Sequence, residues 1–265
     1  MRPIDAGSTG GAGPWFIRAV EVPRLTEPFE AHSYAVDAFG LLTAPALSGW
    51  LQEAAGRHAD RLGVGVEPLQ ARGLTWVLAR QAVVVDRPVA LGERAEVVTW
   101  PSGADRLSAL RDFEVRVEGE TRVRAVTQWI VLDLATRKPV RPGSVLPLEL
   151  VATMDHVVPL PGGRPAIPDP VEVERPFTTR YRDIDRNLHV TNASYVEWAC
   201  ETIPEAVWRS RRLRSFEAFF IAECLHGSRI LSRSSVAGDG VFVHSVVRDD
   251  DQKELARLRT SWVDR

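Results

Sequence analysis

The stretch Tyr181-Arg-Asp-Ile-Asp-Arg-Asn-Leu-His-Val-Thr-Asn-Ala-Ser-Tyr-Val-Glu-Trp-Ala-Cys-Glu201 joins a polar segment to the start of an amphipathic helix. Asp185, Asn187 and His189 stand at alternate positions just before that helix. If the backbone there is extended, alternate side chains point to one face. A carboxylate, an amide and an imidazole would then meet beside a helix N-terminus, whose free N–H groups can hold a developing oxyanion. The arrangement favours acyl-group hydrolysis.

The same stretch has a counterpart earlier in the chain. An offset of 148 residues (185 minus 37) relates four identical pairs, namely Asp37 and Asp185, Thr43 and Thr191, Trp50 and Trp198, and Glu53 and Glu201. A second echo relates Thr127-Gln-Trp129 to Thr260-Ser-Trp262. A repeat of this length predicts two duplicated domains and not a solenoid of short units.

Each copy is expected to begin with a helix. In the first copy, apolar residues follow helical spacing from Leu47 to Leu62, with Thr43 as the N-cap and Gly63 as the C-terminal glycine. In the second copy the helix should run from about Asn192 to Trp208, and Pro204 should kink it or end its first segment.

Strands are expected to follow each helix, because the later segments are rich in β-branched residues and bounded by turn residues. In the first copy they are 75–85, 94–100, 107–117 and 122–134, and in the second 216–224, 229–235, 241–248 and 254–263. One long helix followed by antiparallel strands, present twice, predicts an α+β protein in which a sheet wraps around a helix in each half. The two halves should pair side by side as a pseudo-dimer.

A proline-rich segment separates the copies. Residues 139–176 hold nine of the chain's 18 prolines, which is typical of an extended surface linker. We therefore expect a flexible tail over 1–20, a first domain over 21–140, a linker over 141–176 and a second domain over 177–265.

Composition narrows the functional classes. The chain has 265 residues and a net charge of −2, which gives no argument for binding nucleic acid or a membrane. No apolar run approaches the roughly 20 residues that a membrane span needs. The two cysteines, Cys200 and Cys224, have no metal-type spacing and indicate a reducing, cytoplasmic setting. No phosphate loop, metal-ligand cluster or nucleophile elbow is evident, so we expect no cofactor and no metal.

The pattern Asp185-x-Asn187-x-His189-Val-x-Asn192-x-x-Tyr195-x-x-Trp198-x-x-Glu201 resembles the acyl-acyl-carrier-protein (acyl-ACP) thioesterases, a plant and bacterial family with a double-hotdog fold. Other segments in the same order carry the likeness over about residues 30–265, namely Trp76-Val-Leu-Ala-Arg80, Val83 to Pro88, Arg111-Asp112-Phe113 and Glu223-Cys224. Two departures, Thr191 before Asn192 and Phe220-Ile-Ala222 before Glu223, leave every catalytic group of the pattern in place. The resemblance implies two tandem hotdog domains.

The resemblance also implies a catalytic set made of Asp185, Asn187, His189, Glu223 and Cys224. His189 could shuttle a proton near neutral pH, and Asn187 could donate to the thioester carbonyl or orient the imidazole. Glu223 could act as a base or orient a water, although an ion pair with Arg80 is the structural alternative.

The part played by Cys224 is open between two routes. It could be the nucleophile of a covalent acyl-enzyme, or a small buried neighbour of a glutamate that activates water. We favour the water route.

The first copy carries Phe39 and Leu41 where the second has Asn187 and His189. This asymmetry predicts one working site per chain, with the first half retained to bind the acyl chain. Candidates for lining its tunnel, with ordinary core positions as the alternative, are Trp50, Leu51, Trp76 and Leu78. The densest basic run could dock an acidic carrier protein, or be a solvated loop, through Arg209, Arg211, Arg212 and Arg214.

The expected function is hydrolysis of a fatty acyl thioester on acyl carrier protein, whose phosphopantetheine arm delivers the substrate. An acyl-CoA thioesterase, a non-catalytic acyl-binding protein and a hotdog dehydratase are the rival functions. The sequence leaves the preferred chain length open, and also whether the chain is a monomer or a homodimer.

Overall fold

The computed structural model of the chain describes residues 22–147, 150, 155–160 and 162–265. The predicted tail over 1–20 lies outside these residues. The strands of the first half are β1 (Leu25–Glu30), β2 (Leu74–Val85), β3 (Arg94–Ala104), β4 (Ser108–Val117), β5 (Glu120–Asp133) and β6 (Pro139–Val140). Those of the second are β7 (Val173–Thr178), β8 (Arg211–Phe220), β9 (Arg229–Gly238), β10 (Val241–Arg248) and β11 (Glu254–Asp264).

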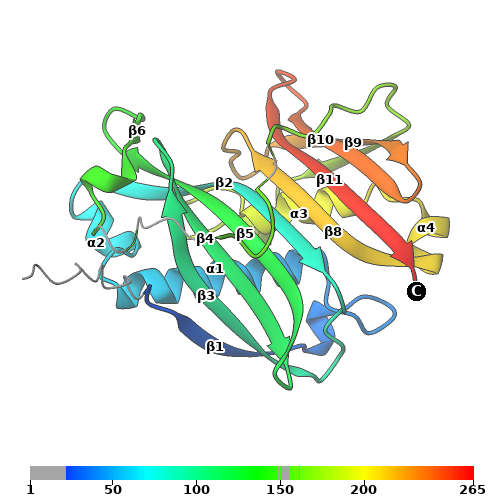
Figure 1. Ribbon diagram of the computed structural model, residues 1–265. Helices are drawn as coiled ribbons and strands as arrows, with labels where there is room; N and C mark the ends of the chain where they lie inside the picture. Colours follow the sequence, from blue (N-terminus) through cyan, green and yellow to red (C-terminus); the bar gives the residue numbers. More distant parts are fainter. Residues whose placement is uncertain (1–21, 148–149, 151–154, 161) are drawn as a thin grey trace, which may run out of the picture.

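All eleven strands belong to a single antiparallel sheet, whose order is β1-β3-β4-β5-β2-β8-β11-β10-β9-β7, with β6 paired to β5 (Figure 1). The halves meet where β2 pairs with β8, over the register from Arg80↔Phe219 to Val84↔Ser215. Each half alone would leave one of these strands as an open edge. Their pairing therefore makes the two predicted hotdog units one continuous sheet.

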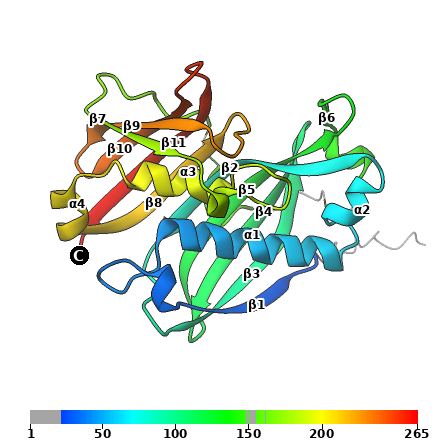
Figure 2. The ribbon, with the colours of Figure 1, turned by 180° about the vertical axis from the view of Figure 1, so that it is seen from behind.

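Two helices lie against the same face of this sheet, α1 (Ala44–Arg61) in the first half and α3 (Asn192–Cys200) in the second (Figure 2). They pack against each other, and one apolar core runs through both halves. The remaining helices are α2 (Val66–Gln70) and α4 (Glu205–Ser210). The prediction of two sheets that wrap helices and pair as a pseudo-dimer is confirmed.

The helix ends follow the sequence signals closely. The Thr43 side chain accepts a hydrogen bond from the Ala46 amide, and Thr191 does the same for Ser194. Gly63 follows the end of α1 with φ +69°, a conformation that glycine adopts without strain. Of the two outcomes expected at Pro204, the structure shows the break: α3 ends at Cys200 and a separate α4 starts after Pro204.

The predicted strands are recovered, with two instructive differences. The strand expected from 216 begins earlier, at Arg211, and stops at Phe220. The outermost strands β1 and β7 were missed, because each is short and contains a proline, Pro28 or Pro176. Proline is tolerated at the edge of a sheet, where its missing N–H faces outward.

The two edge strands repeat each other at the same offset as the helices. Phe29 stacks on Trp50 with ring centroids 5.1 Å apart, and Phe177 stacks on Trp198 at 6.0 Å. Each aromatic pair fastens an edge strand to the helix of its own half. Since β7 begins at Val173, the last residues of the predicted linker are strand.

A buried aspartate ties the linker to the first half. The carboxylate of Asp112, on β4, is fully buried. It accepts from the Val157 amide at 2.7 Å and lies 2.9 Å from His156 Nδ1. His156 and Val157 of the linker are thus anchored to β4, because an unpaired buried carboxylate would be costly.

The second half contains a fully buried histidine. His244 Nδ1 lies 3.1 Å from the Thr202 hydroxyl, which itself donates to the Ala199 carbonyl. His244 Nε2 lies 2.9 Å from Thr260 Oγ1, which accepts from the Trp262 indole. These partners suit a neutral ring that donates from Nδ1 and accepts at Nε2. Burial lowers the pKa of His244 to about 3.

This burial makes folding stability depend on pH. Below about pH 6.5 the unfolded chain protonates His244 while the folded chain does not, so stability is lost as the pH falls from about 6.5 toward 3. Between pH 7 and 5 we expect His244 to account for about 2 kcal/mol of that loss. Urea unfolding at the two pH values should show that His244→Gln loses less stability on acidification, by the amount attributed to His244. The exposed His226→Gln is the control, and equal pH slopes in all three proteins would contradict the account.

Candidate active site

The polar segment before α3 is a closed turn. Asp185 Oδ1 accepts from the amides of Asn187 at 2.8 Å and His189 at 3.2 Å. The Asp185 amide donates to the His189 carbonyl at 2.8 Å, and the Leu188 amide to the Asp185 carbonyl at 3.0 Å. The carboxylate of Asp185 is therefore used in holding the loop, which fixes the backbone that carries Asn187 and His189.

The first half builds the same turn. Asp37 Oδ1 accepts from the amides of Phe39 at 2.9 Å and Leu41 at 3.0 Å. Gly40 has φ +73°, and Leu188, at the matching place in the second half, has φ +63°. The backbone is thus duplicated, while the side chains that it presents differ between the halves.

This geometry corrects the expectation of an extended backbone over Asp185 to His189. Side chains in the turn do not alternate to one face, and Leu188 takes a left-handed conformation that L-residues other than asparagine and aspartate seldom adopt. The Leu188 side chain is 74% exposed. An unfavourable backbone at an exposed, functionally placed loop indicates that its surroundings hold it there.

The imidazole and the glutamate predicted for the site do meet. His189 Nε2 lies 3.5 Å from Glu223 Oε2. The same oxygen accepts from Arg137, which follows β5 in the first half, at 2.6 Å. Glu223 thus does form an ion pair, as the structural alternative expected, and its partner is Arg137. The Arg80 guanidinium lies over the Phe219 ring at 3.8 Å. Arg137 was not predicted, because the sequence gives no sign that it reaches across to the other half.

Among the described residues, no side-chain hydrogen bond or ion pair joins Asn187 or Cys224 to this pair. Asn187 is exposed at the tip of the turn. Cys224 is fully buried, and its thiol lies 3.9 Å from the Leu225 carbonyl. The Cys224 carbonyl accepts from the Val190 amide at 2.9 Å, which ties the end of the turn to the segment after β8.

The matching contact shows what the first half has lost. There the Leu42 amide donates to the Val89 carbonyl at 2.8 Å, so Val89 takes the place of Cys224 and Pro88 that of Glu223. With Phe39 and Leu41 in the turn, all four candidate polar side chains are replaced by apolar ones. The geometry supports the prediction of one working site per chain.

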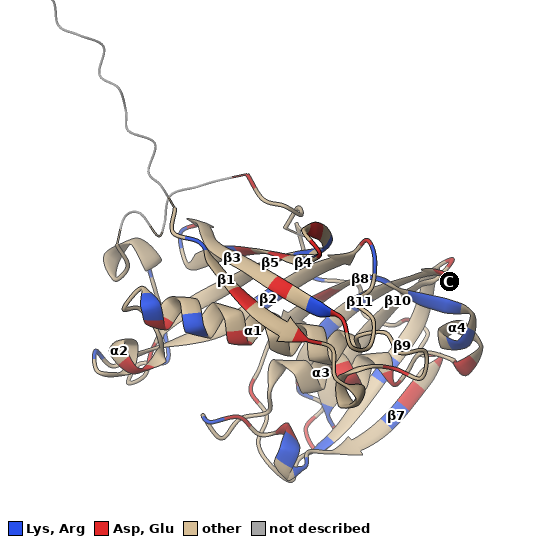
Figure 3. Ribbon diagram, turned by 90° about the horizontal axis from the view of Figure 1, so that it is seen from below, with Lys and Arg blue, Asp and Glu red and all other residues tan. Residues whose placement is uncertain are grey.

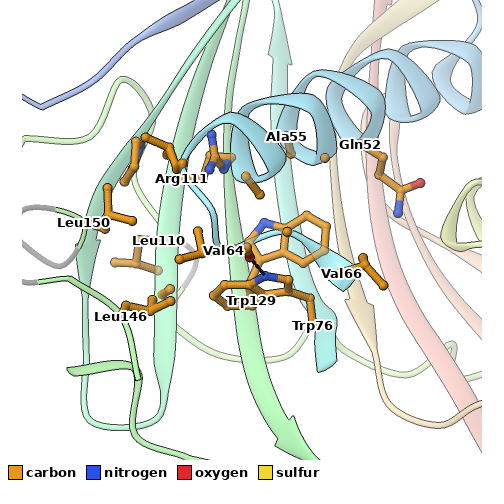
Figure 4. A pocket seen from close by; sticks show the side chains of 16 residues that line it. Gln52, Ala55, Val64, Val66, Trp76, Leu110, Arg111, Trp129, Leu146 and Leu150 are labelled. Carbon is orange, nitrogen blue, oxygen red and sulfur yellow. Dashed lines mark hydrogen bonds between the residues drawn. The ribbon is translucent and has the colours of Figure 1, made fainter. Parts of the chain in front are cut away.

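An apolar cavity of about 230 Å³ lies in the first half, between α1 and the sheet (Figure 4). Trp76 and Trp129 line it and contact each other edge to face, with ring centroids 6.5 Å apart. Their indole N–H groups donate to the Val64 carbonyl and the Thr127 hydroxyl, both at 2.8 Å. The rings therefore offer the cavity their apolar surface.

The cavity approaches the second half at its Val66 side. Figure 4 places Val66 and Gln52 on one side of the two indoles, and Arg111 with Leu146 and Leu150 on the other. Glu67, next to Val66, lies 3.9 Å from Arg186 of the Asp185 turn. Arg186 of the Asp185 turn therefore lies near Glu67, the neighbour of the cavity residue Val66.

Of the four residues predicted to line an acyl tunnel, only Trp76 lines this cavity. Leu51 and Leu78 are core residues, 1% and 3% exposed. Trp50 stacks on Phe29 and borders a separate groove near the start of α1. The alternative of ordinary core was correct for the two leucines.

The basic run predicted to dock a carrier is strand β8 from Arg211 onward and not a solvated loop. Arg211 pairs with Asp239 at 2.7 Å, and Arg214 pairs with Asp86 at 2.7 Å. Arg209 pairs with Glu205 at 2.6 Å. Arg212 carries a buried nitrogen, Nη1, without a hydrogen-bond partner. Figure 3 shows these basic residues around α4 and the adjoining end of β8.

That end of β8 is remote from the His189–Glu223 pair. Nine steps of about 3.3 Å along the strand separate Arg211 from Phe220, or roughly 30 Å. Docking by these arginines stays a prediction, and the ion pairs and this distance weaken its physical basis.

Tyr195, on α3, is a further candidate that sequence reasoning included in the motif without giving it a role. Its hydroxyl is buried and has no hydrogen-bond partner, and its ring packs against Trp198 and Phe220. Burial, with smaller contributions from nearby Cys224 and Glu223, raises the pKa of Tyr195 well above its usual range. The phenol therefore keeps its proton and is an available donor.

Among the described residues, no group of three or more His, Cys, Asp or Glu side chains could hold a metal ion. Within the same part of the chain, none of the helices has the length and apolarity needed to cross a membrane. The two cysteines are free thiols.

Two family models match the chain. The acyl-ACP thioesterase N-terminal domain matches residues 24–146 and the corresponding C-terminal domain matches residues 168–264. A dodecanoyl-[acyl-carrier-protein] hydrolase of Cinnamomum camphora is 28% identical over 88% of the chain and 66% of its own length. A palmitoyl-acyl carrier protein thioesterase of Arabidopsis thaliana is 29% identical, over 88% and 62%. The chain thus spans slightly less than two thirds of these relatives.

Solved structures show the same fold over nearly their whole length. An acyl-ACP thioesterase from Bacteroides thetaiotaomicron superposes with a TM-score of 0.83 at 26% identity, covering 91% of this chain and 98% of its own. A 12:0-ACP thioesterase from Umbellularia californica gives 0.81 at 25% identity, with the same coverage.

The unpartnered hydroxyl of Tyr195 leads to a stability prediction. Removing a buried hydroxyl that has no partner removes a desolvation cost, so Tyr195→Phe should leave the free energy of unfolding unchanged or raise it by about 1 kcal/mol. Urea unfolding beside the exposed control Tyr181→Phe measures this. A loss of about 1 kcal/mol or more in Tyr195→Phe alone would mean that the hydroxyl has a partner after all.

Proposed function

Since the chain belongs to the acyl-ACP thioesterase family, we propose that it hydrolyses a fatty acyl thioester carried by acyl carrier protein. The products are the free fatty acid and the carrier with its phosphopantetheine thiol. No bound cofactor takes part in this chemistry. The partner is the acylated carrier itself, whose arm presents the thioester to the site.

The observation that carries the proposal is the His189–Glu223 contact of 3.5 Å, together with the apolar cavity in the other half. Thioester hydrolysis needs a proton shuttle near the reacting carbonyl and an apolar place for the acyl chain. Asp185 contributes as a positioning residue, because it closes the turn that carries His189.

We favour a water route. Glu223 takes a proton from a water as the water oxygen attacks the carbonyl carbon, while the exposed Asn187 amide donates to the carbonyl oxygen. The C–S bond then breaks, and His189 gives a proton to the departing sulfur. Glu223 passes its proton to His189 across their contact, which restores both groups. Arg137 holds the carboxylate in place through its 2.6 Å contact.

The buried position of Cys224 supports this route over a covalent one. A nucleophilic thiol must reach both the substrate carbonyl and a base. The Cys224 thiol is fully buried and lies near the Leu225 carbonyl. In our proposal Cys224 supports the turn through its backbone carbonyl.

We propose a division of labour between the halves. Residues 21–140 hold the acyl chain in the cavity beside Trp76, and residues 177–265 supply the reacting groups. The proline-rich segment 141–176 connects them.

Activity assays test the assignment directly. His189→Ala and Glu223→Gln should each lower kcat on acyl-ACP about a hundredfold or more, the range expected for loss of acid–base catalysis. Cys224→Ala should keep most of the activity on the water route. The exposed histidine variant His226→Ala is the control. A panel of matched acyl-ACP and acyl-CoA substrates identifies the carrier.

Each contrary outcome has its own meaning. Turnover of acyl-CoA alone would mean that the substrate is carried by CoA and not by acyl carrier protein. Loss of activity in a correctly folded Cys224→Ala would favour the covalent route. Undiminished activity in His189→Ala would overturn the proposed site.

The duplicated turn provides an internal control for Asp185. Asp185→Ala and Asp37→Ala each remove an acceptor for two turn amides, so each should cost about 1–2 kcal/mol of stability. Only Asp185→Ala should also lower kcat, because only its turn carries His189. Asp185→Asn keeps an accepting oxygen and should retain most activity. Equal loss of kcat in Asp185→Asn and Asp185→Ala would instead make the charge of Asp185 catalytic.

A further inference from the structure

Two side chains of the turn before α3 are largely exposed and do little to hold the turn. The Arg186 side chain is 96% exposed and lies 3.9 Å from Glu67, which is itself exposed. An ion pair between two exposed side chains contributes little to stability. Leu188 is 74% exposed, and no apolar cluster of the described residues includes it.

Leu188 also occupies a backbone position that suits glycine. Its φ is +63°, a left-handed conformation in which the Cβ atom of an L-residue comes close to the following carbonyl oxygen. An apolar side chain exposed at such a position gains no packing within the protein. The leucine therefore strains the turn and adds no contact that would stabilise it.

The first-half turn has the same backbone without these two side chains. At the repeat offset, Ala38 takes the place of Arg186, and Gly40 takes that of Leu188. Gly40 has φ +73°, which glycine adopts without strain. The backbone of the turn thus requires neither an arginine nor a leucine. Both occur only in the half that carries the candidate reacting groups, which indicates a task connected with the substrate.

The position of the two side chains suits delivery of the substrate better than chemistry. Leu188 directly precedes His189, and Arg186 and Leu188 flank Asn187. A leucine has no polar group, and a guanidinium does not exchange protons near neutral pH, so neither suits acid–base steps. A macromolecule that brings a thioester to His189 would meet both side chains, because they are exposed on the same turn.

We propose that Arg186 and Leu188 form a docking contact for the acyl carrier protein itself. Arg186 pairs with a carboxylate of the acidic carrier, and Leu188 packs against an apolar side chain near the point where the phosphopantetheine arm is attached. The inference rests on the proposed function, since it takes a carrier-borne thioester as the substrate. It places docking at the turn that carries His189 and not at the basic run on β8.

Charge complementarity favours this partner. Glu67 holds Arg186 only loosely, at 3.9 Å and in contact with water. A carboxylate of the carrier could therefore replace Glu67 without uncovering a buried charge. The combination of an arginine with an apolar side chain is typical of protein interfaces, where apolar contact is surrounded by polar groups. CoA would also bring phosphates to Arg186, so the test includes a CoA ligand.

Binding of non-hydrolysable ligands tests the contact. Acyl carrier protein, pantetheine and CoA each carry the same alkyl chain as a thioether on the thiol, in dodecyl and hexadecyl forms. Their dissociation constants and rates are measured on the immobilised protein by surface plasmon resonance. We expect the wild type to bind the carrier form about tenfold or more tightly than the pantetheine form.

Variants assign this advantage to the two side chains. Arg186→Glu should slow association of the carrier form about tenfold at low salt and weaken its salt dependence, since a charge at the edge of an interface acts mainly on encounter. Leu188→Asn should speed dissociation about fivefold, because it removes the apolar contact. Asparagine tolerates the left-handed backbone, so the urea midpoint should not fall. Leu188→Met keeps an apolar side chain and should retain carrier binding.

The surroundings of the first-half turn provide matched controls. Arg94, at the start of β3, has an exposed side chain. Leu91 is an exposed leucine whose amide donates to the Gly40 carbonyl at 2.8 Å. Arg94→Glu and Leu91→Asn should both bind the carrier form as the wild type does. Arg94→Glu changes the net charge as much as Arg186→Glu, so the pair separates a local contact from an effect of overall charge.

The outcomes separate this contact from the proposed function. A carrier form that binds no more tightly than the pantetheine form, or an advantage that survives Arg186→Glu and Leu188→Asn combined, would overturn the contact even if acyl-ACP is hydrolysed. Equal losses for the CoA and carrier forms would mean that Arg186 binds phosphate, and would also overturn it. Carrier binding that depends on both side chains, without hydrolysis of any acyl-ACP, would support the contact and overturn the thioesterase proposal.

Discussion

The pairing of β2 with β8 is the constraint on which the rest of the structure depends. It joins two sheets that would otherwise each expose a strand edge, and it brings α1 and α3 together over one face. As a result, Arg137 of the first half reaches Glu223 of the second. Glu67, next to the cavity residue Val66, also lies 3.9 Å from Arg186 of the Asp185 turn. The candidate site is therefore a property of the interface, and neither half contains it alone.

The two halves share a backbone and differ in chemistry. In each, an aspartate closes a turn by accepting from two amides, a threonine caps the following helix, and a phenylalanine on an edge strand stacks on a tryptophan. Arg265 of the second half lies over Phe39 in the first-half turn, with its guanidinium 3.5 Å from the ring centroid. The first half has thus kept the scaffold of a site while its side chains became apolar. We infer that this freed its cavity to serve the remaining site.

Much of the fold could be predicted because its signals are local. The caps at Thr43 and Gly63, and the tryptophans at the repeat offset, place the helices and the duplication. The edge strands could not be recognised from the sequence. They are short, Pro28 and Pro176 lower their apparent strand propensity, and their partner strands lie far along the chain. The split of the second helix at Pro204 was one of two outcomes that the sequence allowed.

The site was predicted less completely, for reasons of geometry. The motif was enough to identify Asp185, His189 and Glu223. It did not reveal the turn in which the Asp185 carboxylate accepts hydrogen bonds from backbone amides. Arg137 draws its importance from Glu223 in the other half, which no local pattern encodes. For Leu51 and Leu78, apolar character alone could not separate cavity from core. The register of β2 with β5 places Leu78, and the packing of α1 on the sheet places Leu51 in the core.

The central claim is that the second half provides the reacting groups and the first half holds the acyl chain. A crystal structure of the protein with an alkyl thioether of pantetheine tests it most directly. The account predicts the thioether sulfur beside His189 and Glu223, with the alkyl chain between Trp76 and Trp129 and its end near Arg111. A ligand bound instead at the turn of Phe39 and Leu41, or an alkyl chain lying within the second half, would contradict it.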